Sequence, residues 1–174
     1  VEVAAPLARA LTAEILWPVA VATLDVDAMV VRYSTIPDSP LAHVHTTLNK
    51  RLSLVARAHG WAYLAFCPED ERRILLEMVS RSPAPEDRVA RSAKTIAEVL
   101  REVRTNGHAV RDPAVDPQTS TMAVPVMRGD RVVATVGATF FAKAVTRADA
   151  ARDLAPRLRE LAASIAERMV GAVP

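Results

Sequence analysis

Hydrophobic residues recur at helical spacing in several stretches of this chain. Leu7, Leu11 and Ile15 follow one another at four-residue intervals, which predicts an amphipathic helix over residues 4–15. The same criterion predicts further helices over residues 58–66, after Cys67-Pro68, between Ser92 and Gly107, and from Leu154 through Ile165. Helices with one apolar face need a second layer to pack against, so the remaining segments decide the architecture.

Side chains at helix ends and on helix faces sharpen two of these predictions. The Ser92 hydroxyl can cap the first turn of its helix, and Gly107 stands where that helix would end in a left-handed residue. In the helix that precedes it along the chain, Ile74, Leu75 and Met78 predict the buried face. Each helix is therefore expected to bury one side only.

Runs of β-branched and apolar residues, separated by turn signals, predict strands before and after this helical region. They form two hairpins, residues 17–24 with 28–34 and residues 120–127 with 132–140. The second hairpin has the stronger turn signal, Arg128-Gly129-Asp130. Short strands are expected at residues 52–55 and 108–110, and the proline-bearing residues 35–50 predict a loop or an irregular edge of the sheet. Strands paired through tight turns imply an antiparallel sheet packed on helices, an α+β fold.

The composition fits one globular domain and excludes several classes of protein. The chain has 174 residues, of which 51% are hydrophobic and 24% charged, enough to bury a core. Its 22 basic and 20 acidic residues leave a formal charge of +2, too balanced for a surface that grips nucleic acid. The five glycines form neither of the two glycine-rich phosphate-binding motifs, the Walker A loop and the dinucleotide-binding fingerprint. No apolar run reaches the ~20 residues of a membrane span. One cysteine, Cys67, excludes a disulfide framework, is expected to be buried and inert, and suits a cytoplasmic location.

His43 and His45 are the first candidates for chemistry. If they lie in a strand, their side chains point to one face and both imidazoles could reach one metal ion. Spacing fixes no third ligand, although His59 or Asp112 could converge on the pair in the fold. The simpler reading is two loop histidines in water or in a hydrogen-bonded network. A metal-dependent enzyme that uses His43 and His45 is therefore the alternative function.

Arg57, His59 and Trp61 surround Gly60 where a strand gives way to a helix. Helix N-terminal N–H groups at such a junction bind carboxylates, and Gly60 would let a ligand approach the backbone closely. An aromatic acid would find there a charge partner and a ring to contact. The equally weighted alternative is a surface arginine, a histidine that flanks the helix and a packed tryptophan.

Small polar residues gather in the second hairpin, at Thr119-Ser120-Thr121 and Gly137-Ala138-Thr139. If these segments are neighbouring strands, alternate residues share a face of the sheet. Their short side chains either make room for a ligand or hydrogen-bond across the strands. The residues alone favour the second role, hydrogen bonding between the strands.

Several motifs, in order along the chain, resemble the IclR-type transcriptional regulators. Residues 60–69 (GWAYLAFCPE) resemble a glycine-x-alanine helix that ends in proline and acidic residues. The resemblance continues at residues 100–109 (LREVRTNGHA), 122–126 (MAVPV, similar to I-A-V-P-V) and 154–158 (LAPRL, similar to L-x-P-x-L). It covers essentially the whole chain, and the segment from Thr46 to Ala65 looks closest to regulators of aromatic-acid catabolism.

The resemblance implies a non-enzymatic effector-binding domain over residues 1–174, with a GAF/profilin-like antiparallel sheet. Residues 1–16 would then be the connector helix that follows an N-terminal winged helix-turn-helix domain, which is absent from this sequence. The expected partners are a small organic acid effector and, through the absent domain, DNA, with no membrane and no cofactor. Such regulators are homodimers or homotetramers.

The resemblance also implies where the effector binds. The pocket would be lined by the short strand that precedes the glycine-x-alanine helix, by the first turn of that helix, and by the last two long strands. Together with Arg57, chosen on its chemistry, the expected ligand-binding residues are Leu52, Leu54, Ala58, His59, Gly60, Arg111, Thr119, Thr121, Gly137 and Thr139. A small, aromatic carboxylate is the expected ligand. Arg57, Arg111 or His59 would pair with the carboxylate, and the threonines would bond ring hydroxyls.

Overall fold

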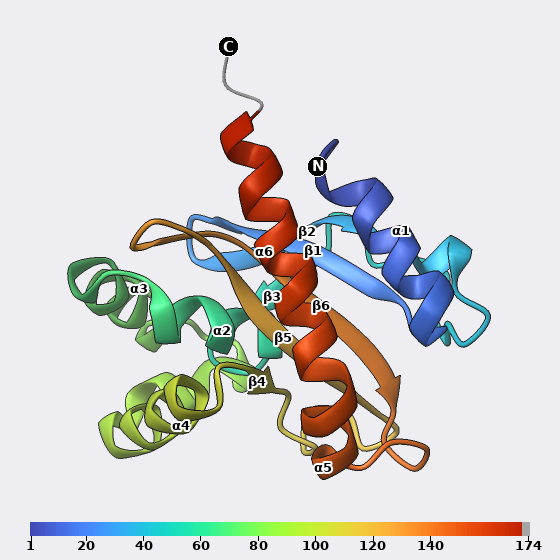
Figure 1. The fold of residues 1–174 in the computed structure, drawn as a ribbon. Coiled ribbons are helices and arrows are strands. Elements are labelled where there is room, and N and C mark those ends of the chain that lie inside the picture. Colours follow the sequence, from blue (N-terminus) through green and yellow to red (C-terminus); the bar gives the residue numbers. More distant parts are fainter. Residues whose placement is uncertain (172–174) are drawn as a thin grey trace.

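A curled six-stranded antiparallel sheet carries helices on both of its faces (Figure 1). The structure is a computed structural model that describes residues 1–171. Its strands are β1 (Val19–Asp25), β2 (Ala28–Ser34), β3 (Arg51–Ser53), β4 (Ala109–Val110), β5 (Thr119–Arg128) and β6 (Arg131–Phe141). Its helices are α1 (Ala4–Ile15), α2 (Ala58–Phe66), α3 (Glu69–Ser80), α4 (Ala93–Asn106), α5 (Arg147–Asp149) and α6 (Ala155–Gly171). The α+β architecture predicted from the sequence is confirmed.

The two predicted hairpins form the framework of the sheet. The spatial order β3-β2-β1-β6-β5-β4 keeps each hairpin intact and joins them by pairing β1 with β6. The β5–β6 turn is tight and has Gly129 at φ +62°, a backbone conformation that glycine adopts without a steric penalty. The first and last strands along the chain therefore lie side by side at the centre of the sheet.

Strand alternation divides the interior into two cores, one on each face of the sheet. On one face, Val136, Ala138 and Phe140 of β6 pack with apolar residues of α1 and α6. The opposite face carries α2 and α4, and Figure 1 shows these helices on the other side of the sheet from α6. There β6 presents Thr135 and Thr139, which are small and polar and leave room beside α2.

Helix α1 is fixed to the sheet by a buried hydroxyl pair. The Oγ1 atoms of Thr12 and Thr35 lie 2.6 Å apart, and Thr35 Oγ1 also accepts the Val19 N–H at 2.8 Å. Immediately after the helix, the Leu16 carbonyl accepts the Ser39 hydroxyl at 2.6 Å. The end of α1 is thus bonded both to the sheet and to the loop that follows β2.

The predicted ends of α4 are confirmed, whereas the predicted buried face of α3 is wrong in part. Ser92 Oγ accepts the Thr95 N–H at 3.3 Å, and Gly107 closes the helix at φ +68°. In α3, Ile74 is 52% exposed and Met78 is 39% exposed. The helix lies at the outer end of its layer (Figure 1), so only the side with Leu75 is covered.

The C-terminal helix starts with an irregular segment. Thr146 caps the short helix α5, and a π-helical turn over Ala150–Leu154 then leads into α6. Pro156, the second residue of α6, has no N–H to donate to the preceding turn, which accounts for the changed bonding just before it. Within residues 1–171, no helix combines the length and the apolar character needed to cross a membrane.

Candidate functional site

A cavity of about 210 Å³ lies on the α2 side of the sheet, under the loop that joins β2 to β3. The predicted ligand-binding residues that line it are Leu52, Arg57, Ala58, His59, Arg111, Thr121 and Thr139. They come from β3, the first turn of α2, the segment after β4, and the strands β5 and β6. The fold therefore brings together residues that are up to 87 positions apart between Leu52 and Thr139.

The other predicted ligand-binding residues lie behind the cavity wall. A Cβ atom at Gly60 would lie 2.3 Å from Leu54 Cα, so the start of α2 packs directly on the backbone of the preceding segment. Gly60 thus admits its own chain and not a ligand, contrary to the role expected from the sequence. Gly137 leaves space for the neighbouring strand and for a side chain of α2, since a Cβ there would lie 2.7 Å from the Met122 carbonyl oxygen and 3.0 Å from His59 Nε2. Thr119 bonds Arg111 and supports it from behind.

The sequence suggested that the ring of Trp61 would contact the ligand, but in the structure Trp61 lies away from the cavity. Its side chain is buried in the core around α2 and does not line the cavity. The packed-tryptophan alternative is therefore correct for this residue. The reason is the helical period: one residue beyond Gly60, the side chain points away from the face that carries Ala58 and His59.

His59 forms part of the cavity floor as a neutral side chain. It is 3% exposed, and its Nδ1 atom lies 2.8 Å from the hydroxyl of Thr135. Burial lowers the pKa of His59 to about 4 because the charged imidazolium loses its hydration. At neutral pH the ring offers a ligand a hydrogen bond, and it supplies no charge for a carboxylate.

Arg111 supplies the charge that His59 lacks. Its Nη2 atom donates to the carbonyl and the hydroxyl of Thr119 and lies 3.5 Å from a carboxylate oxygen of Asp116. Burial lowers the pKa of Arg111, but a guanidinium starts so high that it stays protonated. The buried Nε atom of Arg111 has no hydrogen-bond partner within the described part of the chain.

Arg57 lies beside the first turn of α2 and has the same unusual feature. Its Nη2 atom is 3.1 Å from Glu86 Oε2, outside the cavity, while its buried Nε atom has no partner. In the residues whose side chains are described, Nε of Arg57 and Nε of Arg111 are the buried side-chain nitrogen or oxygen atoms left without a hydrogen bond. A buried donor without an acceptor costs about 1–3 kcal/mol, so both atoms favour an acceptor from outside the chain.

The N-terminus of α2 adds donors to the same wall. Arg57 takes the N-cap position with an extended backbone, and no side chain caps the helix. The first N–H groups of α2, next to the cavity residues Ala58 and His59, therefore have no capping acceptor among the described residues. Such N–H groups carry partial positive charge and favour an anion.

Thr121 and Thr139 face each other across β5 and β6. Their hydroxyl oxygens lie 2.9 Å apart, and both side chains line the cavity. The sequence offered two roles for these residues, making room for a ligand and bonding between strands. The pair Thr121 and Thr139 fills both roles. Each hydroxyl keeps capacity for a further hydrogen bond.

The loop from Ser39 to Lys50 forms the roof of the cavity. His43 faces the cavity and meets Phe141 edge-on with ring centroids 5.9 Å apart. Neither His43 nor His45 lies in a strand, so the geometry that would direct both rings to one metal ion is missing. Throughout residues 1–171, no group of three or more His, Cys, Asp or Glu is placed to hold a metal. The metal-dependent alternative has no supporting geometry.

Cys67 is buried at the end of α2, as predicted. Burial raises the pKa of its thiol to about 11, and the nearby Glu71 adds to the effect. At neutral pH the thiol is therefore protonated and unreactive. Nucleophilic chemistry has no basis at this residue.

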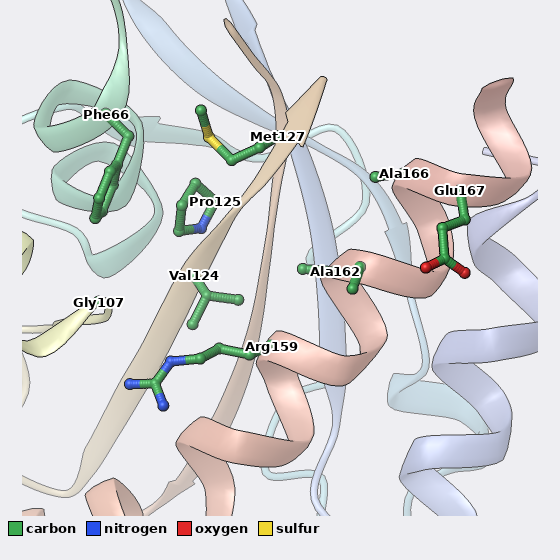
Figure 2. Close-up of a pocket in the computed structure, with 10 residues that line it drawn as sticks. Phe66, Gly107, Val124, Pro125, Met127, Arg159, Ala162, Ala166 and Glu167 are labelled. Carbon is green, nitrogen blue, oxygen red and sulfur yellow. The ribbon is translucent and has the colours of Figure 1, made fainter. Parts of the chain in front are cut away.

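A second hollow, of about 520 Å³, lies outside the sheet between α6 and β5. Figure 2 shows Val124, Pro125 and Met127 of β5 on one side and Ala162 of α6 on the other. The walls are largely apolar, and the guanidinium of Arg159 already donates to the Asn106 carbonyl at 2.6 Å. This groove is larger, but none of the described side chains that line it carries an unpartnered buried donor. The arginine-lined cavity is therefore the better candidate for a small anionic ligand.

Comparison with known proteins assigns the chain that carries this site to a family. Residues 1–167 match the family model described as bacterial transcriptional regulator IclR C-terminal. The chain belongs to the IclR family. It corresponds to the effector-binding C-terminal domain of these regulators, and the sheet and helices follow the GAF-like fold of that domain.

Solved structures of IclR-family regulators agree with this assignment. A protein described as a transcriptional regulator of Rhodococcus sp. RHA1, RHA06195, is 27% identical with a TM-score of 0.80 and is matched over 99% of this chain and 70% of its own. An IclR family transcriptional regulator from Brucella abortus is 26% identical with a TM-score of 0.79, over 99% of this chain and 63% of its own. The chain thus spans about two thirds of the length of these regulators.

One solved relative carries a named ligand. It is a double mutant of the inducer-binding domain of the PobR transcription factor from Acinetobacter, in complex with 3-hydroxybenzoic acid. It is 19% identical with a TM-score of 0.75, over 95% of this chain and 96% of its own. At this identity the likeness concerns the fold.

Proposed function

We propose that this IclR-family domain binds a small aromatic monocarboxylic acid in the cavity between α2 and the β2–β3 loop. The observation that carries the proposal is the pair of buried Nε atoms of Arg57 and Arg111, which have no acceptor among the residues whose side chains are described. A carboxylate is planar, carries two acceptor oxygens and matches a guanidinium in shape and charge. Both arginines line the cavity, so a ligand of this class would meet two guanidinium groups there.

The dimensions and walls of the cavity favour one aromatic ring. A volume of about 210 Å³ lies below the roughly 300–1,000 Å³ typical of sites for drug-sized ligands. Ala20, Val31 and Leu52 offer apolar surface, while the hydroxyls of Thr121 and Thr139 can bond a ring substituent. The aromatic acid bound by the PobR domain, which shares the fold, supports the same ligand class and a role in aromatic catabolism.

The rest of the regulator follows from the family. We infer that residues 1–16 connect this domain to a winged helix-turn-helix domain that binds DNA, and that the complete protein is a homodimer or homotetramer. The bonds of α1 to the sheet and to the roof loop support a connector that responds to the ligand. A ligand changes the DNA-binding state only insofar as it prefers one arrangement of the protein.

The proposal is tested by calorimetric titration with benzoate, 3-hydroxybenzoate and 3-phenylpropionate, with benzamide as the neutral counterpart of benzoate. We expect at least one acid to bind, and benzamide to bind at least ten-fold more weakly than benzoate. Arg111→Gln should weaken the acid's binding by about 10–100-fold, the range for losing a charged hydrogen bond in a buried site. Arg57→Gln should act in the same direction.

Arg159→Gln is the matched control, since Arg159 lies in the groove beside α6 and not in the cavity. It should leave the affinity unchanged. Equal binding of benzoate and benzamide would contradict the carboxylate assignment. A loss of binding in Arg159→Gln with none in Arg111→Gln would move the site to the groove.

A further inference from the structure

Asp116 is the one acidic residue among those that line the cavity in the described part of the chain. It lies in the segment between β4 and β5, and its side chain is 35% exposed. A carboxylate in the wall of this site would weaken the binding of a ligand carboxylate, because like charges repel most strongly where water is scarce. The presence of Asp116 therefore needs an explanation.

Two donors hold Asp116 in its ionised form. The Thr119 hydroxyl donates to Oδ2 at 2.6 Å, and the Gln118 N–H donates to Oδ1 at 2.9 Å. These bonds, with the nearby Arg111 guanidinium, lower the pKa of Asp116 below its usual range. The carboxylate is therefore a fixed negative charge at every pH near neutrality.

Asp116 lies near Arg111 without engaging it closely. The distance from Arg111 Nη2 to Asp116 Oδ2 is 3.5 Å, compared with about 2.7–2.9 Å for a strong charged hydrogen bond. Asp116 thus compensates the charge of the guanidinium but leaves its Nε atom free for another acceptor. Thr119, which bonds both residues, keeps them at this separation.

The charges around the cavity leave room for one anion. Lys50, Arg57 and Arg111 line it as cations, and Lys50 makes no ion pair with any residue from 1 to 169. Glu86 is paired with Arg57 from outside, and Asp116 is near Arg111. Three cations against two carboxylates leave a single positive charge, which one ligand carboxylate would balance.

We propose that Asp116 is a specificity-determining residue that restricts the site to monoanions. It acts as an internal counter-ion, so a second carboxylate on the ligand would meet its negative charge. This inference rests on the proposed function and names the selectivity of the same site. Without Asp116, the cavity would keep two uncompensated cations and would suit a dicarboxylate.

The test compares two ligands that differ at one ring position, 3-hydroxybenzoate and isophthalate, in which a second carboxylate replaces the hydroxyl. Calorimetric titrations at pH 7 are made on the unmodified protein, on Asp116→Asn and on Asp112→Asn. Asparagine keeps an oxygen that can accept the Thr119 hydroxyl but removes the charge. Asp112 lies in the same segment, is exposed and does not line the cavity, which makes it the matched control.

We expect the unmodified protein to bind 3-hydroxybenzoate at least ten-fold more tightly than isophthalate. Asp116→Asn should bind isophthalate about ten-fold or more better than the unmodified protein does, with a smaller gain for 3-hydroxybenzoate. Asp112→Asn should leave the ratio unchanged. Equal binding of both acids by the unmodified protein, or a ratio unchanged in Asp116→Asn, would overturn the inference.

Weaker binding of both acids by Asp116→Asn would also overturn it, because Asp116 would then serve to position Arg111. If the unmodified protein binds neither these acids nor benzoate, the proposed function itself fails and the selectivity falls with it. Binding of 3-hydroxybenzoate without the predicted discrimination leaves the proposed function standing and rejects only the role of Asp116.

Discussion

The buried histidine at the cavity floor makes the stability of the domain depend on pH. His59 has a pKa of about 4 in the folded protein, compared with 6.5 for an unperturbed histidine. Between these values the unfolded chain binds a proton that the folded protein does not. The free energy of unfolding should therefore fall as the pH decreases from 7 toward 4.

The size of this effect follows from the difference between the two pKa values. At pH 7 His59 is neutral in the folded protein and mostly neutral in the unfolded chain, so it contributes almost nothing. At pH 5 the unfolded histidine is almost fully charged and the folded one is not, which costs about 2 kcal/mol relative to pH 7. Below pH 4 the loss levels off at about 3 kcal/mol, when both states are protonated.

His59→Gln isolates this contribution. Glutamine cannot take up a proton but keeps a polar group that can reach the Thr135 hydroxyl. Urea denaturation at pH 7, 6 and 5, followed by the fluorescence of the two tryptophans, gives the free energy of unfolding of each variant. The difference between the variant and the unmodified protein should shift in favour of the variant by about 2 kcal/mol from pH 7 to pH 5.

Other titrating groups cancel in this comparison. Burial also lowers the pKa of His108, but His108 is present in both proteins. His45→Gln, which makes the same substitution at an exposed residue of the roof loop, is the matched control. If the His59→Gln and unmodified curves run parallel from pH 7 to pH 5, then His59 is not buried as a neutral ring and the account of the cavity floor is wrong.

Two further predictions concern the elements that position the site. Gly60→Ala should destabilise the domain by about 3 kcal/mol or more, because its Cβ would lie 2.3 Å from Leu54 Cα and the backbone cannot move away cheaply. Gly129→Ala is the comparison: its Cβ would lie in open space and only the positive φ opposes it, so it should cost about 1 kcal/mol. If the two variants lost equal stability in thermal denaturation, the close approach at Gly60 would be contradicted. Ser92→Ala should cost about 1 kcal/mol through loss of the α4 cap, whereas Ser92→Thr should keep most of it; no loss in Ser92→Ala would show that the bond to the Thr95 N–H does not stabilise the helix.

Local patterns in the sequence were sufficient for the hairpins and the helix ends because the interactions that fix them are local. The turn at Gly129 and the cap at Ser92 each depend on residues within four positions along the chain. The buried face of α3 could not be obtained in this way. Whether Ile74 is covered depends on which helices pack beside α3, and that arrangement is decided by contacts distant in sequence.

The same distinction explains which site residues the sequence could identify. Arg57 attracts notice as a cation where a strand gives way to a helix, and strand alternation places Thr121 and Thr139 on one face. Arg111 came only from the resemblance to the IclR-type regulators, because nothing local in the sequence marks it. The protonation of His59 could not be inferred, since it depends on complete burial against β6, and Gly137 shows its purpose only when the ring is seen beside it.

Asp116 marks the limit of what could be read from the chain alone. In the sequence it is an aspartate directly before Pro117, in a segment that reads as a turn, where aspartate is common for reasons of local bonding. Its Oδ1 atom makes such a local bond, to the Gln118 N–H, and nothing in that bond points to a ligand. Its importance comes from Oδ2, which faces Arg111 only because the segment folds back beside β5. A charge that selects among ligands can therefore have an ordinary turn sequence, and such residues are found by counting the charges around a cavity after the fold is known.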